Sequence, residues 1–159
     1  KGFVQFMKKA KSVGIDGLIL PDMAVEESKE YLAAARKNKL DTIFLISPNT
    51  NTERIKKILN ATSGFLYLVS IFGTTGMQMK IQKYTVDAIK KTKKIVNKRI
   101  PIGIGFGVYT PNDARKFLSL GVDAIIVGSA FLRLIERTPS DKIESKIASF
   151  TKTLKNTTR

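Results

Sequence analysis

The sequence has 159 residues, with 28 Lys and Arg against 13 Asp and Glu, a formal net charge of +15, and neither Cys nor His. Without Cys and His there are no disulfides, thiolate or imidazole metal sites, or Ser-His-Asp and Cys-His nucleophile pairs. Any chemistry therefore depends on carboxylates, lysine, tyrosine, hydroxyls and backbone amides.

The apolar content indicates one ordinary domain over residues 1–159, because 43% of the residues are hydrophobic. Its longest apolar runs are far shorter than the roughly 20 residues of a membrane helix, and the start of the chain does not resemble a signal peptide. We therefore expect a cytoplasmic protein with no membrane partner. The chain opens at Lys1 inside a helical pattern rather than at a Met, so we expect its natural beginning to lie upstream.

Helix and strand patterns alternate from the start of the chain. Helically spaced apolar residues predict a helix over 3–10 that ends at Gly14. The apolar run 17–21 predicts a buried strand, and the acidic turn 26–28 leads into a second helix. A second strand is predicted over 42–47.

The pattern repeats in the middle of the chain. Thr50 and Glu53 have the spacing of a capping box and predict the start of a helix. A strand predicted over 65–70 runs into the Gly-rich loop 73–76, and a Lys-rich helix follows.

The last third begins with a strand predicted over 101–106. Thr110, the proline after it and Asp113 predict a helix start, and Gly121 predicts its end. The strand predicted over 124–128 precedes a short helical stretch at 131–135. A final amphipathic helix carries apolar residues from 143 to 154, and we expect the tail 155–159 to be frayed.

Strands that alternate with helices make a parallel sheet, so the fold class is α/β. An open doubly wound sheet is one solution. A complete (β/α)8 barrel takes about 250 residues, and its last five strand-helix units would fit this length. The spacing alone leaves both architectures open.

Ligands of parallel α/β proteins bind beyond the carboxyl ends of the strands. Glycines stand there in the segments 105–107 and 128–129, where barrels of this kind often bind phosphate. The amides that begin the following short helix can also hold an anion. Two glycine-bearing ends together with the Ser129 hydroxyl favour a phosphate-binding cup over ordinary tight turns.

Other strand-end residues have weaker signals. The loop 73–76 fits a lid that closes over substrate, or an ordinary loop. Tyr67 points to the opposite face from its neighbours, where packing is favoured over ligand contact. Asp22 fits a catalytic carboxylate, although such an Asp more often caps a turn.

The positive charge raises nucleic acid as an alternative partner, because 80–99 contains eight Lys and Arg against one acid, Asp87. No aromatic stacking platform is interleaved with these lysines and no recognition motif accompanies them, so a solvated basic surface is the simpler interpretation.

Several segments together resemble the tryptophan synthase alpha subunit. They are GIDGLILPDMAVEES at 14–28, FLISPNT at 44–50, YLVSIFGTTG at 67–76, GIGFGV at 103–108 and GVDAIIVGSA at 121–130. The Gly-Phe-Gly and Val-Gly-Ser-Ala pieces occur in many phosphate-binding barrels, whereas the strand-end Asp with Val-Glu-Glu-Ser, the Ser-Pro-Asn and the Thr-Gly loop are more specific.

The resemblance implies a (β/α)8 barrel that cleaves indole-3-glycerol phosphate to indole and glyceraldehyde 3-phosphate. Indole then passes to a pyridoxal-phosphate-dependent beta subunit in an alpha-2 beta-2 assembly, and no cofactor or metal is expected in the alpha chain. The resemblance assigns phosphate binding to Gly76, Gly107, Gly128 and Ser129. It assigns the indole and glycerol pocket to Tyr67 and Phe106, the closing loop to Thr75, and the partner-facing surface to Asp22.

Two departures from the family follow. Its catalytic Glu and Asp precede the segment that matches Lys1, so we expect no catalytic residue in this chain and no activity from it alone. Ala24 stands where the family commonly has Pro. The alternatives are another phosphate-sugar barrel enzyme and a basic phosphate- or nucleic-acid-binding module.

Overall fold

The computed structural model describes residues 2–70, 81–105 and 107–158. The helices are α1 (Phe3–Ser12), α2 (Lys29–Lys37), α3 (Thr52–Ala61), α4 (Lys83–Val96), α5 (Pro111–Ser119), α6 (Ser129–Glu136) and α7 (Ile143–Thr157), with 3-10 turns η1 (Val25–Glu27) and η2 (Ser140–Lys142). The strands are β1 (Gly17–Ile19), β2 (Asp41–Ile43), β3 (Leu45–Ile46), β4 (Leu66–Val69), β5 (Ile102–Gly105) and β6 (Ala124–Ile126).

All strand pairs are parallel, and spatial neighbours are also neighbours in the sequence. The orders are β1-β2 and β3-β4-β5-β6. The strand predicted over 42–47 is interrupted at Phe44, whose carbonyl still accepts a 3.1 Å hydrogen bond from the Tyr67 amide. A doubly wound sheet reverses its strand order at a switch point, whereas a barrel adds strands in one direction. The sequential order therefore selects the barrel.

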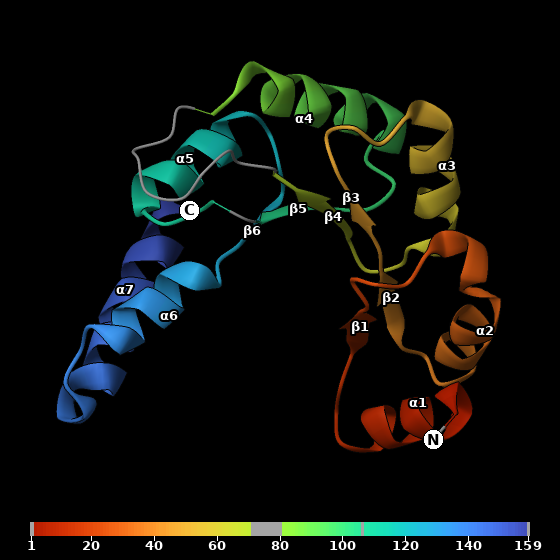
Figure 1. Ribbon diagram of the computed structural model, residues 1–159, viewed down its shortest axis with the longest axis horizontal. Coiled ribbons are helices and arrows are strands. Elements are labelled where there is room, and N and C mark those ends of the chain that lie inside the picture. Colours follow the sequence, from red (N-terminus) through yellow and green to blue (C-terminus); the bar gives the residue numbers. More distant parts are fainter. Residues whose placement is uncertain (1, 71–80, 106, 159) are drawn as a thin grey trace.

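The strands follow an arc with α2, α3, α4 and α5 along its outer side (Figure 1). The core fills the layer between them. Its largest fully buried side chains include Tyr31, Phe117, Met7, Ile55, Leu66, Leu68, Ile89 and Ile104. The buried Tyr31 hydroxyl donates to the Leu18 carbonyl at 3.2 Å, so its polar atom is satisfied inside the apolar layer.

Helix α5 begins as its sequence predicts. The Asp113 amide donates to the Thr110 hydroxyl at 3.1 Å, and the Thr110 amide donates to the Asp113 carboxylate at 2.9 Å. This reciprocal capping box satisfies two amides that a helix start leaves unpaired. Gly121, with φ +84°, follows the end of this helix, as predicted.

The prediction that Thr50 and Glu53 cap α3 is wrong. The Thr50 hydroxyl is used one turn earlier, where it accepts from the Ser47 amide at 2.9 Å. Asn51 caps the helix instead, because its side-chain oxygen accepts from the Arg54 amide at 2.8 Å. The loop that ends β3 therefore shifts the start of the helix by one residue.

The prediction of a frayed tail from residue 155 is also wrong, because α7 continues to Thr157. Leu154 packs against the hydrophobic core and holds the last turns of the helix. The rings of Phe131 and Phe150 meet edge to face with centroids 5.1 Å apart, which joins α7 to α6.

Among the described helices, none combines the length and apolar character needed to cross a membrane.

Candidate phosphate site

A pocket of about 130 Å³ lies where β4, β5 and β6 approach their carboxyl ends. Four of the residues predicted from the sequence line it, namely Tyr67, Gly107, Gly128 and Ser129. Val108, Tyr109 and Ile126 complete its wall. A space of this size suits one small group such as phosphate, since a water molecule takes about 30 Å³ in the liquid.

Tyr67 reaches the pocket because glycines face it on the adjacent strand. In the β4–β5 register Tyr67 pairs with Gly103, and Val69 pairs with Gly105. A Cβ atom at Gly105 would collide with the Tyr67 hydroxyl. Burial leaves Tyr67 only 8% exposed and raises the pKa of its phenol, so it remains neutral near pH 7. The side chain is both packed and part of the pocket wall.

The loop after β5 contributes backbone to the pocket. Gly107 has φ +82°, which a residue with a Cβ rarely adopts. This conformation turns the chain at the pocket and buries Val108 immediately after it. A close approach of the Gly107 backbone to a ligand stays a prediction.

The N-terminus of α6 faces the same pocket. The amides of Phe131 and Leu132 both donate to the Gly128 carbonyl, at 2.9 and 3.3 Å. The two preceding amides, Ser129 and Ala130, lie at the helix start, where intrahelical acceptors are lacking. The first turn of α6 carries no acidic residue, so its dipole is not offset locally. The first amides and the dipole of α6, together with the exposed Ser129 hydroxyl, are therefore suited to binding an oxyanion.

Tyr109 is a pocket residue that the sequence analysis did not assign. Its ring lies under the guanidinium group of Arg133, with Cζ 4.4 Å from the ring centroid, within cation–π distance. Tyr109 lies in the strand-end segment where ligand contacts are expected, and this position could have identified it as a pocket residue. Its contact with Arg133 of α6 could not be predicted from the spacing of residues in the sequence.

Three predicted site residues, Thr75, Gly76 and Phe106, lie outside the described residues, as does the predicted lid 73–76. Asp22 is described and lies away from the pocket. It occupies the third position of a turn closed by the Met23 amide and the Leu20 carbonyl at 3.2 Å, with Pro21 at the favoured second position. Its side chain is exposed at the surface.

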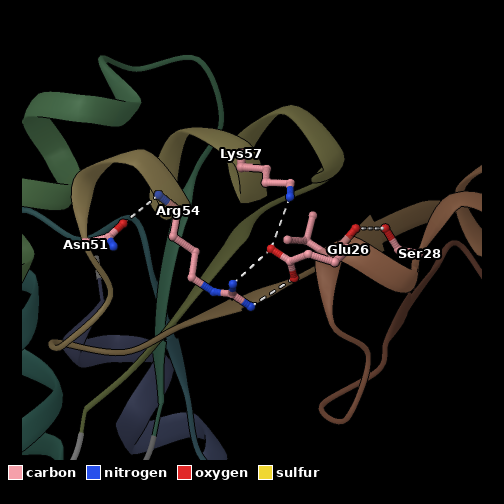
Figure 2. Close-up of polar contacts among 6 residues, drawn as sticks. Glu26, Ser28, Asn51, Arg54 and Lys57 are labelled. Carbon is pink, nitrogen blue, oxygen red and sulfur yellow. Dashed lines mark hydrogen bonds and ion pairs between the residues drawn. The ribbon is translucent and has the colours of Figure 1, made fainter.

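A surface ion cluster connects the 3-10 turn η1 to helix α3 (Figure 2). Arg54 donates to both carboxylate oxygens of Glu26, at 2.9 and 3.2 Å, and the Lys57 ammonium lies 3.2 Å from one of them. A backbone hydrogen bond at Glu26 and the hydrogen bond from Lys57 lower the pKa of the Glu26 carboxyl, with the Arg54 charge adding to the effect. The cluster joins η1, which follows β1, to α3.

The described pocket wall contains no Asp or Glu. Across the described ranges, no group of three acidic, Cys or His side chains gathers to hold a metal ion. The pocket as described is therefore suited to binding an anion and holds no carboxylate for proton transfer.

A family model described as "Tryptophan synthase alpha chain" matches residues 1–159. The chain belongs to this family. Tryptophan synthase alpha chains are among its curated relatives. The protein from Petrotoga mobilis is 39% identical over 156 residues, which cover 97% of this chain and 59% of the relative. The protein from Thermococcus kodakarensis is 36% identical over 149 residues, covering 92% of this chain and 59% of the relative.

Solved structures of the family share the fold. A chain of the tryptophan synthase α2β2 complex from Pyrococcus furiosus superposes with a TM-score of 0.87 at 34% identity, covering 98% of this chain and 61% of that one. A chain of the enzyme from M. tuberculosis superposes with a TM-score of 0.82 at 26% identity, covering 99% and 56%. The chain thus spans just under three fifths of the two curated relatives. The predicted (β/α)8 barrel class is confirmed, and neither alternative function is favoured.

Proposed function

We propose that this chain serves the alpha reaction of tryptophan synthase, the cleavage of indole-3-glycerol phosphate to indole and glyceraldehyde 3-phosphate. This is a carbon–carbon lyase step of tryptophan biosynthesis and would take place in the cytoplasm. The observation that carries the proposal is the single pocket that brings together Tyr67, Gly107, Gly128 and Ser129. Membership of the family supports it.

In this proposal the pocket binds the substrate phosphate. The Ser129 hydroxyl and the first amides of α6 donate hydrogen bonds to the phosphate oxygens, and Gly107 lets the loop backbone approach them. Gly76 would supply a further contact. Tyr67 and Phe106 would line the indole and glycerol part of the site, and Thr75 would belong to the loop that closes over it.

We assign the proton transfers to a Glu and an Asp outside these 159 residues. The lack of an Asp or Glu in the described pocket wall supports this assignment. Indole formation requires protonation and deprotonation of the substrate, which a phosphate site alone does not supply. Phosphate binding and catalysis should therefore be separable.

The proposed partner is a tryptophan synthase beta subunit in an alpha-2 beta-2 assembly, with Asp22 on the contacting surface. The α2β2 complex of the Pyrococcus furiosus relative supports this choice. Pyridoxal phosphate would belong to the beta subunit, and the alpha chain would need no cofactor.

Indole release from indole-3-glycerol phosphate tests the activity. We expect no release from the 159-residue chain, and release from a chimera that adds the segment of the Petrotoga mobilis relative that this chain does not match. Activity of the 159 residues alone would show that a catalytic pair lies within them. A folded chimera that releases no indole would contradict the proposed reaction.

Ser129→Ala tests the phosphate site. Loss of one hydrogen bond to a charged group should weaken glycerol 3-phosphate binding about tenfold. Ser119→Ala is the matched control, because Ser119 is an exposed serine that bonds within its own helix. Equal affinities in the two variants would argue against phosphate at α6.

A further inference from the structure

Tyr109 forms a wall between two pockets. One is the 130 Å³ phosphate pocket, and the other is a 260 Å³ surface pocket lined also by Arg133 and Arg137. Tyr109 therefore borders the proposed phosphate site, and Arg133 of α6 covers its ring. Neither side chain belongs to the set expected from the family resemblance.

The backbone of Tyr109 is fixed on one side by α5. Its amide donates to the Asp113 carboxylate at 3.3 Å, and this carboxylate also accepts from Thr110 in the capping box. The loop that begins at Gly107 is thus attached to the start of α5. The contact between the Tyr109 ring and the Arg133 guanidinium connects the same loop to α6.

Arg133 comes from the helix whose first residues line the phosphate pocket. It lies four residues after Ser129, one helical turn along the same face. Packing of Phe131 on Phe150 of α7 fixes the helix. Contact between Arg133 and Tyr109 therefore connects the Gly107 loop to the helix that begins at the phosphate pocket.

The guanidinium charge also acts near the pocket. Glu26 is the only acid that forms an ion pair in the described part of the chain, so Arg133 has no carboxylate partner there. A cation held beside a pocket-lining residue raises the electrostatic potential felt by an anion in the pocket.

We propose that Tyr109 and Arg133 form a positioning pair for the substrate phosphate: their cation–π contact holds the Gly107 loop and the start of α6 at the spacing that phosphate binding requires. The inference rests on the proposed function and deepens it. Arg133 acts through Tyr109 and lines only the neighbouring pocket, so it is a positioning residue rather than a phosphate ligand.

The chain offers a matched pair of arginines for the test. Arg137 lies one helical turn beyond Arg133 and lines the same 260 Å³ pocket. In the described structure, only Arg133 stacks on Tyr109. Arg133→Met and Arg137→Met remove the same charge and keep an apolar stem, but only the first removes the cation–π contact.

Thermal unfolding of the 159-residue chain over a glycerol 3-phosphate series reports stability and binding together, because ligand raises Tm according to its Kd. We expect Arg133→Met and Tyr109→Leu each to weaken binding about two- to fivefold, the range of an exposed cation–π contact. Tyr109→Phe keeps the ring and should bind like the unsubstituted chain. Arg133→Lys keeps the charge without the planar guanidinium. Its affinity should therefore fall between those of Arg133→Met and the unsubstituted chain.

Each outcome decides the inference. Equal weakening by Arg133→Met and Arg137→Met would show a bulk charge effect and overturn the positioning role. A lower ligand-free Tm with unchanged affinity would reduce the pair to a structural contact and also overturn it. If the unsubstituted chain binds no glycerol 3-phosphate while its ligand-free melt is cooperative, the proposed phosphate site fails and the inference fails with it.

Discussion

The Tyr67 side chain lies across the backbone of Gly105, in the space that a side chain at position 105 would occupy. The two residues come from adjacent parallel strands, β4 and β5, and belong to the same region of the sheet. A glycine is required here by close packing rather than by an unusual φ. The phosphate pocket owes one of its walls to this pairing, because Tyr67 could not take its position over a larger residue.

Gly105→Ala should displace the Tyr67 ring. Its new Cβ would meet two ring carbons at 2.8 Å in addition to the hydroxyl, and overpacking of this kind costs about 1–3 kcal/mol. We expect a lower free energy of unfolding and weaker glycerol 3-phosphate binding, measured by denaturant titration and by ligand-dependent melting.

Gly2→Ala is the control for this change, since a Cβ there has no neighbour within 4 Å. It should leave both quantities close to those of the unsubstituted chain. A Gly105→Ala variant with unaltered stability and affinity would show that Tyr67 moves aside at no cost.

The sequence was sufficient to predict the succession of strands and helices, because continuous apolar runs marked the strands, and helical spacing with Gly14, Gly121 and the Thr110–Pro111 start marked several helices. It also placed Gly107, Gly128 and Ser129 at one site, since the carboxyl ends of parallel strands share an edge. Tyr67 could not be decided in the same way. Its role depends on the glycine opposite it, which only the strand register identifies.

Competition between neighbouring polar side chains also limited what the sequence could predict about helix caps. Thr50 and Asn51 are both good caps, and the choice between them depends on the Ser47 amide that engages Thr50. The Arg133 contact with Tyr109 joins residues from α6 and the loop after β5, whose approach is a tertiary property. Local patterns carry no information about either interaction.

The corrected cap of α3 can be tested by two substitutions. Asn51→Ala removes the oxygen that accepts from the Arg54 amide and should lower the free energy of unfolding by about 1 kcal/mol. Glu53→Ala should cost less, because Asn51 rather than Thr50 is the cap and no capping box with Glu53 forms. Denaturant titration of both variants gives the comparison, and a larger loss for Glu53→Ala would restore the original prediction.

The Glu26 cluster should make stability depend on acid pH. Its carboxyl has a lower pKa in the folded chain than the ordinary value of 4.5, so the folded state favours the ionised form. The resulting stabilisation is fully present above pH 4.5 and is lost as the pH falls through the lowered folded pKa. A melting difference between the unsubstituted chain and Glu26→Gln should therefore shrink in that range.

Glu27→Gln removes the same charge at the neighbouring position and serves as the control for Glu26→Gln. Glu27 is exposed and, in the described structure, has no ion-pair partner. The effect of Glu26→Gln should also decrease with added salt, because the pair is solvent-exposed, with 47% of the Arg54 side chain accessible. Identical pH profiles for the two variants would remove the cluster as the cause.

The open ends of the sheet predict self-association of the 159-residue chain. Among the described strands, β1 pairs only with β2, and β6 pairs only with β5. Each end therefore presents unpaired backbone groups to which another strand can add. Ile19 lies on β1 and is 41% exposed, so apolar surface accompanies this free edge.

A charge on the edge should oppose this pairing, as lysines do on natural edge strands. We expect Ile19→Lys to shift the chain toward monomer in sedimentation velocity measured over a concentration series. Leu132→Lys is the matched control, because Leu132 is 63% exposed but lies on helix α6. Equal effects of the two lysines would assign association to exposed apolar surface in general. A chain that is monomeric over the whole concentration series without either substitution would show that these edges do not drive association.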